Sequence, residues 1–187
     1  MSKKADDSSV LRHLAGTMDI GKTLEEFPGL TQEQLSDILA RASERMEMTE
    51  NAKAQIWVDG AARGNPGEGG AGAYLEISGC EPLGRGEYLG NATNNVAEYR
   101  ALLLGLKMAN ELNIKAAEIC SDSELMIKQM TGEYRVKNEA LKNLFSMAQK
   151  AAGRLESVSY RHVPREENVE ADRLANMALD ARGPVKL

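Results

Sequence analysis

Four acidic residues in four separate sequence settings have the chemistry of a metal-assisted reaction. Asp59 and Asp122 each follow a short apolar run typical of a buried strand, whereas Glu98 and Asp172 lie in helical patterns. Acids gathered beside a buried strand repel one another unless cations neutralise them, and hard carboxylate oxygens favour Mg²⁺ or Mn²⁺. Two such ions can activate a water and stabilise a leaving oxygen. The four acids therefore predict a two-metal site for phosphoryl transfer.

Short polar motifs accompany each acid. The turn Gly64-Asn65-Pro66-Gly67 follows Asp59, Thr93-Asn94-Asn95 precedes Glu98, Ser123 follows Asp122, and His162 and Asn168 lie ten and four residues before Asp172. In this order, between about Gln55 and Ala181, the motifs resemble those of type 1 ribonuclease H. That family cuts the RNA strand of RNA–DNA hybrids.

The resemblance implies an endoribonuclease that leaves 5′-phosphate and 3′-hydroxyl ends. It also implies two Mg²⁺ ions, with Mn²⁺ as an alternative. Asp59 is expected to bridge both ions, Asp172 to complete the ion that generates the attacking hydroxide, and Glu98 and Asp122 to hold the ion at the leaving oxygen. His162 is expected to move protons or to help the product leave, because imidazole titrates near neutral pH.

Substrate contacts are predicted at Asn65, Thr93, Asn94 and Asn95. Amides and hydroxyls at a helix N-terminus can bind phosphate, and they can also reach the 2′-hydroxyl that distinguishes RNA from DNA. Thr93 or Asn94 can equally serve as a helix cap. Asn168 is expected to support either the second metal or the loop that follows His162.

The order of predicted elements indicates an α/β domain over residues 55–183. This order matches the ribonuclease H fold, and the resemblance implies a five-stranded mixed sheet flanked by helices, in which the first and fourth strands are neighbours. A Gly-rich turn is predicted from Gly60 to Gly72. The predicted strands are Ala54–Val58, Ala73–Ile77, Leu83–Leu89, Ala117–Ser121 and Val158–His162, and the predicted helices are Asn95–Leu112, Glu124–Met130, Glu139–Gly153 and Val169–Ala181.

The N-terminal quarter has a different pattern. Residues 1–9 are predicted as a flexible tail, 10–48 as a small all-helical module and 49–54 as a linker. Asp19 and Thr31 are candidate N-caps. About 40 residues bury little core alone, so we expect this module to contact a protein partner or to self-associate.

Composition is consistent with a globular protein. The chain has 187 residues, 27% of them charged, and a net charge of −5. Residues 1–50 carry −4 and residues 51–187 carry −1, so two divalent ions would bring the catalytic part to about +3, and salt-sensitive hybrid binding is expected. No apolar stretch approaches the roughly 18–20 residues of a membrane span. The polar N-terminus and two unrelated cysteines favour a cytoplasmic location without membrane contact.

Two departures from the family pattern qualify the resemblance. Glu124 stands where several family members have a substrate-contacting glutamine, and a carboxylate there would repel phosphate. The region between Gln129 and Leu144 is short and retains only Tyr134, Arg135 and Lys137 near the place of a basic protrusion. Two other functions remain open: another member of the same fold superfamily, such as a resolvase, transposase or integrase, and a catalytically silent module that binds hybrid or RNA.

Overall fold

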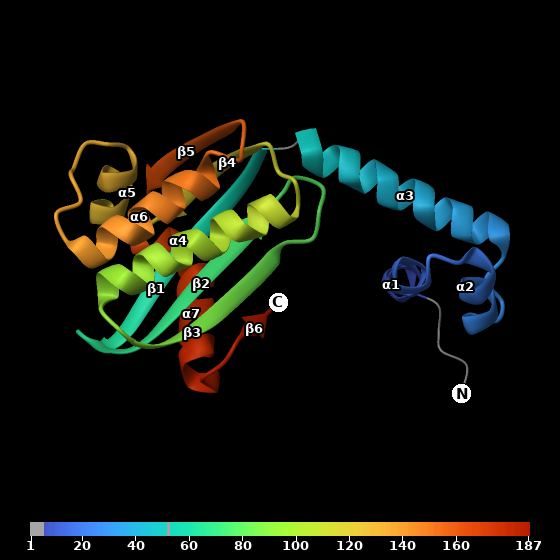
Figure 1. The fold of residues 1–187 in the computed structure, drawn as a ribbon, viewed down its shortest axis with the longest axis horizontal. Coiled ribbons are helices and arrows are strands. Elements are labelled where there is room, and N and C mark those ends of the chain that lie inside the picture. The colour runs from blue at the N-terminus through green and yellow to red at the C-terminus, as the bar shows by residue number, and fades with distance from the viewer. Residues whose placement is uncertain (1–5, 52) are drawn as a thin grey trace. The chain divides into compact units, whose positions relative to one another are not determined.

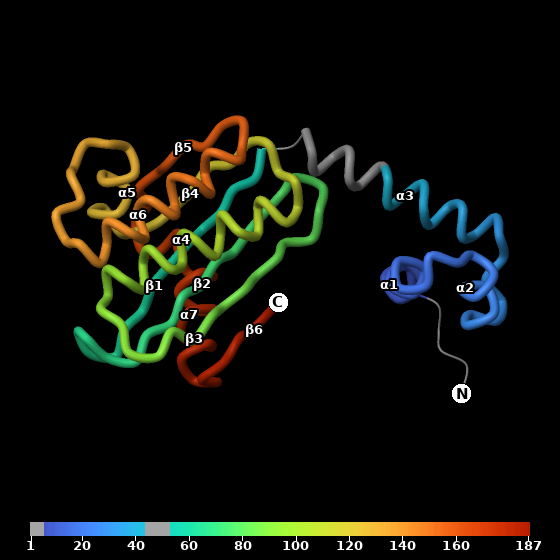
Figure 2. Tube along the Cα trace, in the orientation of Figure 1, coloured from blue at the N-terminus to red at the C-terminus, as the bar shows by residue number. Residues whose placement is uncertain are grey.

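The chain folds into two compact units, one up to Met48 and the other from Thr49 to Leu187. The computed structural model describes residues 6–51 and 53–187 (Figures 1 and 2). Each unit has its own apolar core, and the second contains all the candidate site residues. The units are therefore described separately.

The second unit is built on one mixed sheet (Figure 1). Its strand order is β5-β4-β1-β2-β3-β6, in which β1, β2 and β3 are antiparallel and β4 and β5 run parallel to β1. β1 and β4 are direct neighbours, as expected. The strands are β1 (Lys53–Gly64), β2 (Gly67–Glu76), β3 (Leu83–Ala92), β4 (Ala116–Ser121), β5 (Ser157–His162) and β6 (Val185–Lys186).

Helices cover both faces of this sheet. Figure 1 shows α4 and α6 in front of the strands and α7 behind them. Large buried side chains of α4, including Tyr99, Leu102 and Leu106, belong to the same core cluster as Ile56 and Leu75 of the sheet. The helical elements are α4 (Asn94–Glu111), α5 (Glu124–Met130), α6 (Glu139–Ala152), the 3₁₀ turn η1 (Arg165–Glu167) and α7 (Val169–Ala181).

The predicted long turn from Gly60 to Gly72 is wrong. β1 and β2 extend through this segment as a hairpin that pairs Gly64 with Gly67. The glycines serve close packing: a Cβ at Gly60 would lie 2.1 Å from the main chain of α4, and one at Gly72 would lie 2.1 Å from Ala171 of α7. Glycine in a strand commonly marks such a close approach of another backbone.

The prediction of five strands is also wrong, because the sheet has six. Val185 and Lys186 form β6, which pairs with Gly86 and Arg85 of β3. The folded unit accordingly continues beyond the predicted boundary at residue 183. Two residues that lie just after a helix give too short a pattern to be recognised as a strand.

From residue 6 onward, the described part of the first unit has three helices: α1 (Asp7–Thr17), α2 (Ile20–Glu26) and α3 (Gln32–Asn51). Asp19 caps α2 by accepting a hydrogen bond from the Lys22 amide. At the start of α3, Thr31 and Gln34 exchange side chain-to-amide bonds as a capping box. The small core contains Val10, Phe27, Leu35 and Ile38.

The predicted edges of this unit need two corrections. α1 begins at Asp7 with Asp6 as its N-cap, so residues 7–9 are not a tail. α3 runs to Asn51 and β1 begins at Lys53, so most of the predicted linker at 49–54 is regular structure. Residues 1–5 and Ala52 lie outside the described residues. Throughout the described ranges, no helix has both the length and the apolar character that crossing a membrane demands.

Candidate active site

The parallel pairing of β1 and β4 brings two of the acids together. Trp57 is in register with Cys120, so Asp59 and Asp122 lie two residues further along neighbouring strands. Asp59 lies inside β1 rather than at its end, is only 7% exposed, and lies within hydrogen-bonding reach of the Asp122 carboxyl group. Asp122 directly follows β4 and is partly buried.

Glu98 reaches the same place from α4. Because Gly60 has no side chain, the main chain at Ala97 and Glu98 packs directly on β1. The Gly60 amide donates a hydrogen bond to the Glu98 carboxylate. Glu98 is 7% exposed, and its Oε2 atom is buried without a hydrogen-bond partner. A buried carboxylate oxygen without a donor is costly, so this position favours a cationic ligand.

The raised pKa values of two of the acids also favour a bound cation. Burial first, and then the charges of Asp122 and Asp172, raise the pKa of Asp59 to about 7. Burial, followed by the charges of Asp59 and Asp122, raises the pKa of Glu98 to about 9. Arg165 opposes the rise at Asp59. The acids therefore cannot all be ionised at neutral pH unless additional positive charge is present.

Asp172 joins the cluster from the first turn of α7, but protein donors engage both of its oxygens. Arg165 Nη2 lies 3.1 Å from Oδ1, and Asn176 Nδ2 lies 3.2 Å from Oδ2. In the described ranges, no three His, Cys, Asp or Glu side chains are already arranged as ligands of one metal ion. The donor set fits a divalent metal in type, since it consists of carboxylate oxygens, and Oε2 of Glu98 is buried without a hydrogen-bond partner.

Asn168 links the loop before α7 to the acids. It is 1% exposed, and its Nδ2 donates to the carbonyl of Val58 at 3.1 Å and to Oδ1 of Asp122 at 2.9 Å. Its own Oδ1 is buried without a partner. Asn168 thus holds Asp122 to β1.

His162 lies at the end of β5 and is exposed. Its Nε2 atom is 3.2 Å from the main-chain carbonyl of Asp122. The imidazole therefore lies beside the acids and is open to solvent, as a group that exchanges protons requires.

The predicted substrate residues meet at the start of α4. Thr93 caps the helix by accepting a hydrogen bond from the Val96 amide at 3.4 Å, and Asn65 Oδ1 accepts one from the Asn94 amide at 3.2 Å. Two of the helix N–H groups are thus already used, and the exposed side chains of Asn94 and Asn95 remain for a ligand.

A groove of about 570 Å³ adjoins this helix end. Asn95, Tyr134, Arg135 and Lys137 are among its lining residues, so the basic side chains noted in the sequence lie beside a predicted substrate residue. Glu124 is exposed, and Lys128 Nζ lies 2.6 Å from its Oε1. This ion pair offsets part of the expected repulsion of phosphate.

Sequence reasoning missed Arg165, Asn176 and Gln129. Asn176 lies one helical turn after Asp172, so its spacing could have identified it, whereas the contact of Arg165 with Asp172 depends on the loop conformation before α7. Gln129 is buried and accepts a hydrogen bond from the hydroxyl of Tyr99 at 2.7 Å. No sequence motif marks it.

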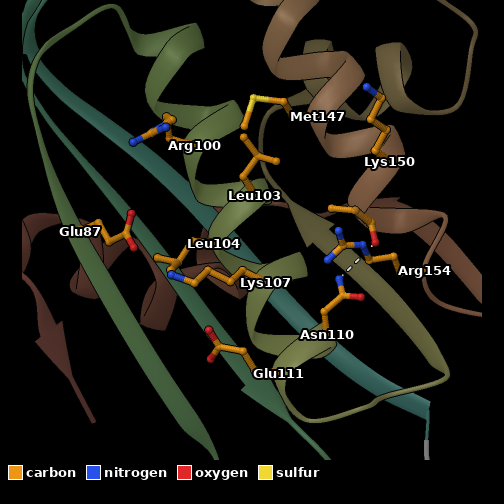
Figure 3. A pocket seen from close by; sticks show the side chains of 11 residues that line it. Glu87, Arg100, Leu103, Leu104, Lys107, Asn110, Glu111, Met147, Lys150 and Arg154 are labelled. Atoms are coloured by element: carbon orange, nitrogen blue, oxygen red, sulfur yellow. Dashed lines mark hydrogen bonds between the residues drawn. The ribbon is translucent and has the colours of Figure 1, made fainter.

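A second groove, of about 620 Å³, lies between α4, α6 and β3 (Figure 3). Leu103, Leu104 and Met147 line it together with charged side chains that include Arg100 and Lys107. None of the four acids, His162 or the predicted substrate residues lines it, so it is separate from the candidate active site.

Residues 57–178 match a protein-family model described as Reverse transcriptase-like. The bifunctional protein Rv2228c of Mycobacterium tuberculosis is 42% identical over 131 residues, which cover 69% of this chain and 36% of that protein. The solved structure of the N-terminal RNase H domain of the same protein has a TM-score of 0.67 and 41% identity, covering 70% of this chain and 96% of that one. This chain belongs to the type 1 ribonuclease H family.

The structure of a second relative contains a bound nucleic acid. LC11-RNase H1, whose crystal structure is in complex with an RNA/DNA hybrid, has a TM-score of 0.65 and 36% identity, and the match covers 69% of this chain and 98% of that one. The chain spans only about a third of the length of the mycobacterial relatives that it matches, so the similarity concerns their ribonuclease H part. The family match begins at residue 57, after the N-terminal unit.

Proposed function

We propose that this protein is an endoribonuclease that hydrolyses the RNA strand of RNA–DNA hybrids and leaves 5′-phosphate and 3′-hydroxyl ends. The observation that carries the proposal is the set of four acids around the β1–β4 pair, with the raised pKa values of Asp59 and Glu98 and the unpartnered Glu98 Oε2. Membership in the ribonuclease H family supports the same reaction.

Asp59, Glu98, Asp122 and Asp172 would hold two Mg²⁺ ions, or Mn²⁺ in their place. When bound, these ions supply an activated water and neutralise charge on the phosphate. The protein's own residues orient the ligands: the Gly60 amide fixes one oxygen of Glu98, and Asn168 fixes one oxygen of Asp122. His162 accepts or delivers protons beside Asp122, or helps the product to leave.

Asn65, Thr93, Asn94 and Asn95 would select the substrate. Their amides and hydroxyl can reach phosphates and 2′-hydroxyl groups at the start of α4. The neighbouring groove with Tyr134, Arg135 and Lys137 would then receive the other strand. The hybrid bound by LC11-RNase H1 supports an RNA–DNA hybrid as the substrate. Residues 10–48 would serve a protein partner or self-association.

The deciding experiment is cleavage of a labelled RNA–DNA hybrid with Mg²⁺ or Mn²⁺, run beside single-stranded RNA, duplex RNA and duplex DNA. Asp59→Asn is the test variant. Asp180→Asn is the matched control, because Asp180 is an exposed aspartate that pairs with Arg63 and not with the acids. We expect hybrid-specific, metal-dependent cleavage that Asp59→Asn abolishes and Asp180→Asn retains. Hybrid binding without cleavage under either metal would instead identify a silent binding module.

A further inference from the structure

Asp172 differs from the other acids because a cation of the protein itself already binds it. Arg165 Nη2 lies 3.1 Å from Asp172 Oδ1, while Asn176 fills a site on Oδ2. Glu98, by contrast, keeps a buried oxygen without any partner. An arginine therefore neutralises Asp172, whereas Glu98 has an oxygen that no group in the described part of the protein pairs with.

Arg165 can leave Asp172 without disturbing the fold. It belongs to the short turn η1, which Asn168 anchors through Val58 and Asp122. Its side chain is 77% exposed, compared with 33% for that of Asp172. An ion pair this exposed is weak, and the guanidinium needs only a change of rotamer to move into solvent.

We propose that Arg165 is a built-in counter-ion that holds Asp172 while the site is free of metal and must release it before Asp172 can bind a divalent ion. Arg165 then competes with the metal: it relieves repulsion among the acids when no metal is bound, and it lowers the affinity for the ion that Asp172 completes. The inference rests on the proposed function for the identity of that ion.

The size of the competition follows from the exposure of the pair. Exposed ion pairs are worth little, so removing Arg165 should strengthen metal binding by about two- to fivefold. A purely structural role for Arg165 predicts a different result, because its loss would then lower stability equally with and without metal and leave metal affinity unchanged.

The test is calorimetric titration of Mn²⁺ into the full chain, stripped of metal and without nucleic acid. Arg165→Gln removes the charge, and Arg165→Lys keeps it. Arg173→Gln is the matched control, since Arg173 is adjacent to Asp172 in sequence but pairs with Glu170 at 2.7 Å. We expect Arg165→Gln to bind Mn²⁺ about two- to fivefold more tightly than wild type, Arg165→Lys to stay near wild type, and Arg173→Gln to be unchanged.

Thermal unfolding gives a second readout that needs no activity. Arg165→Gln should melt at a lower temperature than wild type without metal and should gain more from added Mn²⁺. Equal or weaker Mn²⁺ binding by Arg165→Gln, or no Mn²⁺ binding by any form, overturns the inference. If wild type nevertheless cleaves the hybrid, the proposed function survives that result; if wild type neither binds Mn²⁺ nor cleaves, both fail.

Discussion

At the scale of single residues, the candidate site brings carboxylates close together, where their negative charges repel one another. Asp59 and Glu98 are buried beside like charges, and their pKa values are raised to about 7 and about 9. An acid whose pKa is higher in the folded protein than in the unfolded chain stabilises the fold only while it is protonated. Its contribution is complete below the unfolded value near 4 and is lost as the pH rises toward the folded value. Function at neutral pH therefore has a cost in stability.

This cost predicts the behaviour of Asp59→Asn without metal. Removing the carboxylate should leave stability almost unchanged near pH 4 and make the variant more stable than wild type by roughly 1–3 kcal/mol at pH 8. Urea unfolding with a chelator, from pH 4.5 to 8.5, measures the difference. Added Mg²⁺ should reduce the difference in unfolding free energy between the variant and wild type, because it stabilises wild type. A difference that is constant with pH would contradict the assigned origin of the raised pKa.

Asn168 supports a second prediction at this scale. Asn168→Ala deletes the donor to Val58 and Asp122, so we expect a loss of about 1–3 kcal/mol in stability and a fall in cleavage of roughly tenfold or more. Asn110→Ala is the control, because it deletes donors to the carbonyls of Leu106 and Ala151 at a cost of about 1 kcal/mol, and Asn110 lines the groove that is separate from the candidate active site. Equal activity in the two variants would show that Asn168 acts only on stability.

At the scale of elements, the site depends on how closely α4 packs on β1. Gly60→Ala would place a methyl group 2.1 Å from the main chain of Ala97 and Glu98, so α4 must move and carry Glu98 with it. We expect destabilisation of about 1–3 kcal/mol and loss of most cleavage. In Gly183→Ala the nearest contact is an ordinary 3.7 Å, and both properties should stay near wild type. Hybrid-cleavage rates and urea unfolding should be measured for both variants. Full activity in Gly60→Ala would mean that the position of Glu98 does not matter for catalysis.

The same close packing explains where sequence reasoning failed. Alternation and helical spacing located most helices and strands, and the pairing of β1 with β4 agreed with expectation. The glycines of Gly60–Gly72 predict a turn from local sequence, whereas in the structure most of them lie in β1 and β2, where α4 and α7 pack against Gly60 and Gly72. Local sequence shows that a residue is small but not which backbone will approach it. For the same reason the link from Arg165 to Asp172 was missed, because it depends on the loop conformation before α7.

At the scale of the whole molecule, charge and site residues are divided between two units. All four acids, His162 and the predicted substrate residues belong to the unit from Thr49 to Leu187, which has its own core. Residues 1–48 contain nine acidic and six basic residues, so they add a net charge of −3 and none of the predicted ligands. Negative charge covalently attached to a nucleic-acid enzyme weakens its binding to a polyanion, and salt screens that effect.

Removing residues 1–48 should therefore leave an active enzyme. We expect the shortened protein to fold, to cleave hybrid with a turnover rate within about twofold of the full chain, and to bind hybrid as tightly or more tightly at low salt. Hybrid affinity can be measured without cleavage by using the inactive Asp59→Asn variant, with and without residues 1–48, at about 50 and 300 mM salt. The difference in affinity between the full and the shortened chain should be smaller at 300 mM, because salt screens the repulsion between residues 1–48 and the nucleic acid. Markedly weaker hybrid binding by the shortened form would mean that the N-terminal helices contact the substrate, and their acidity would then require a role other than electrostatic attraction.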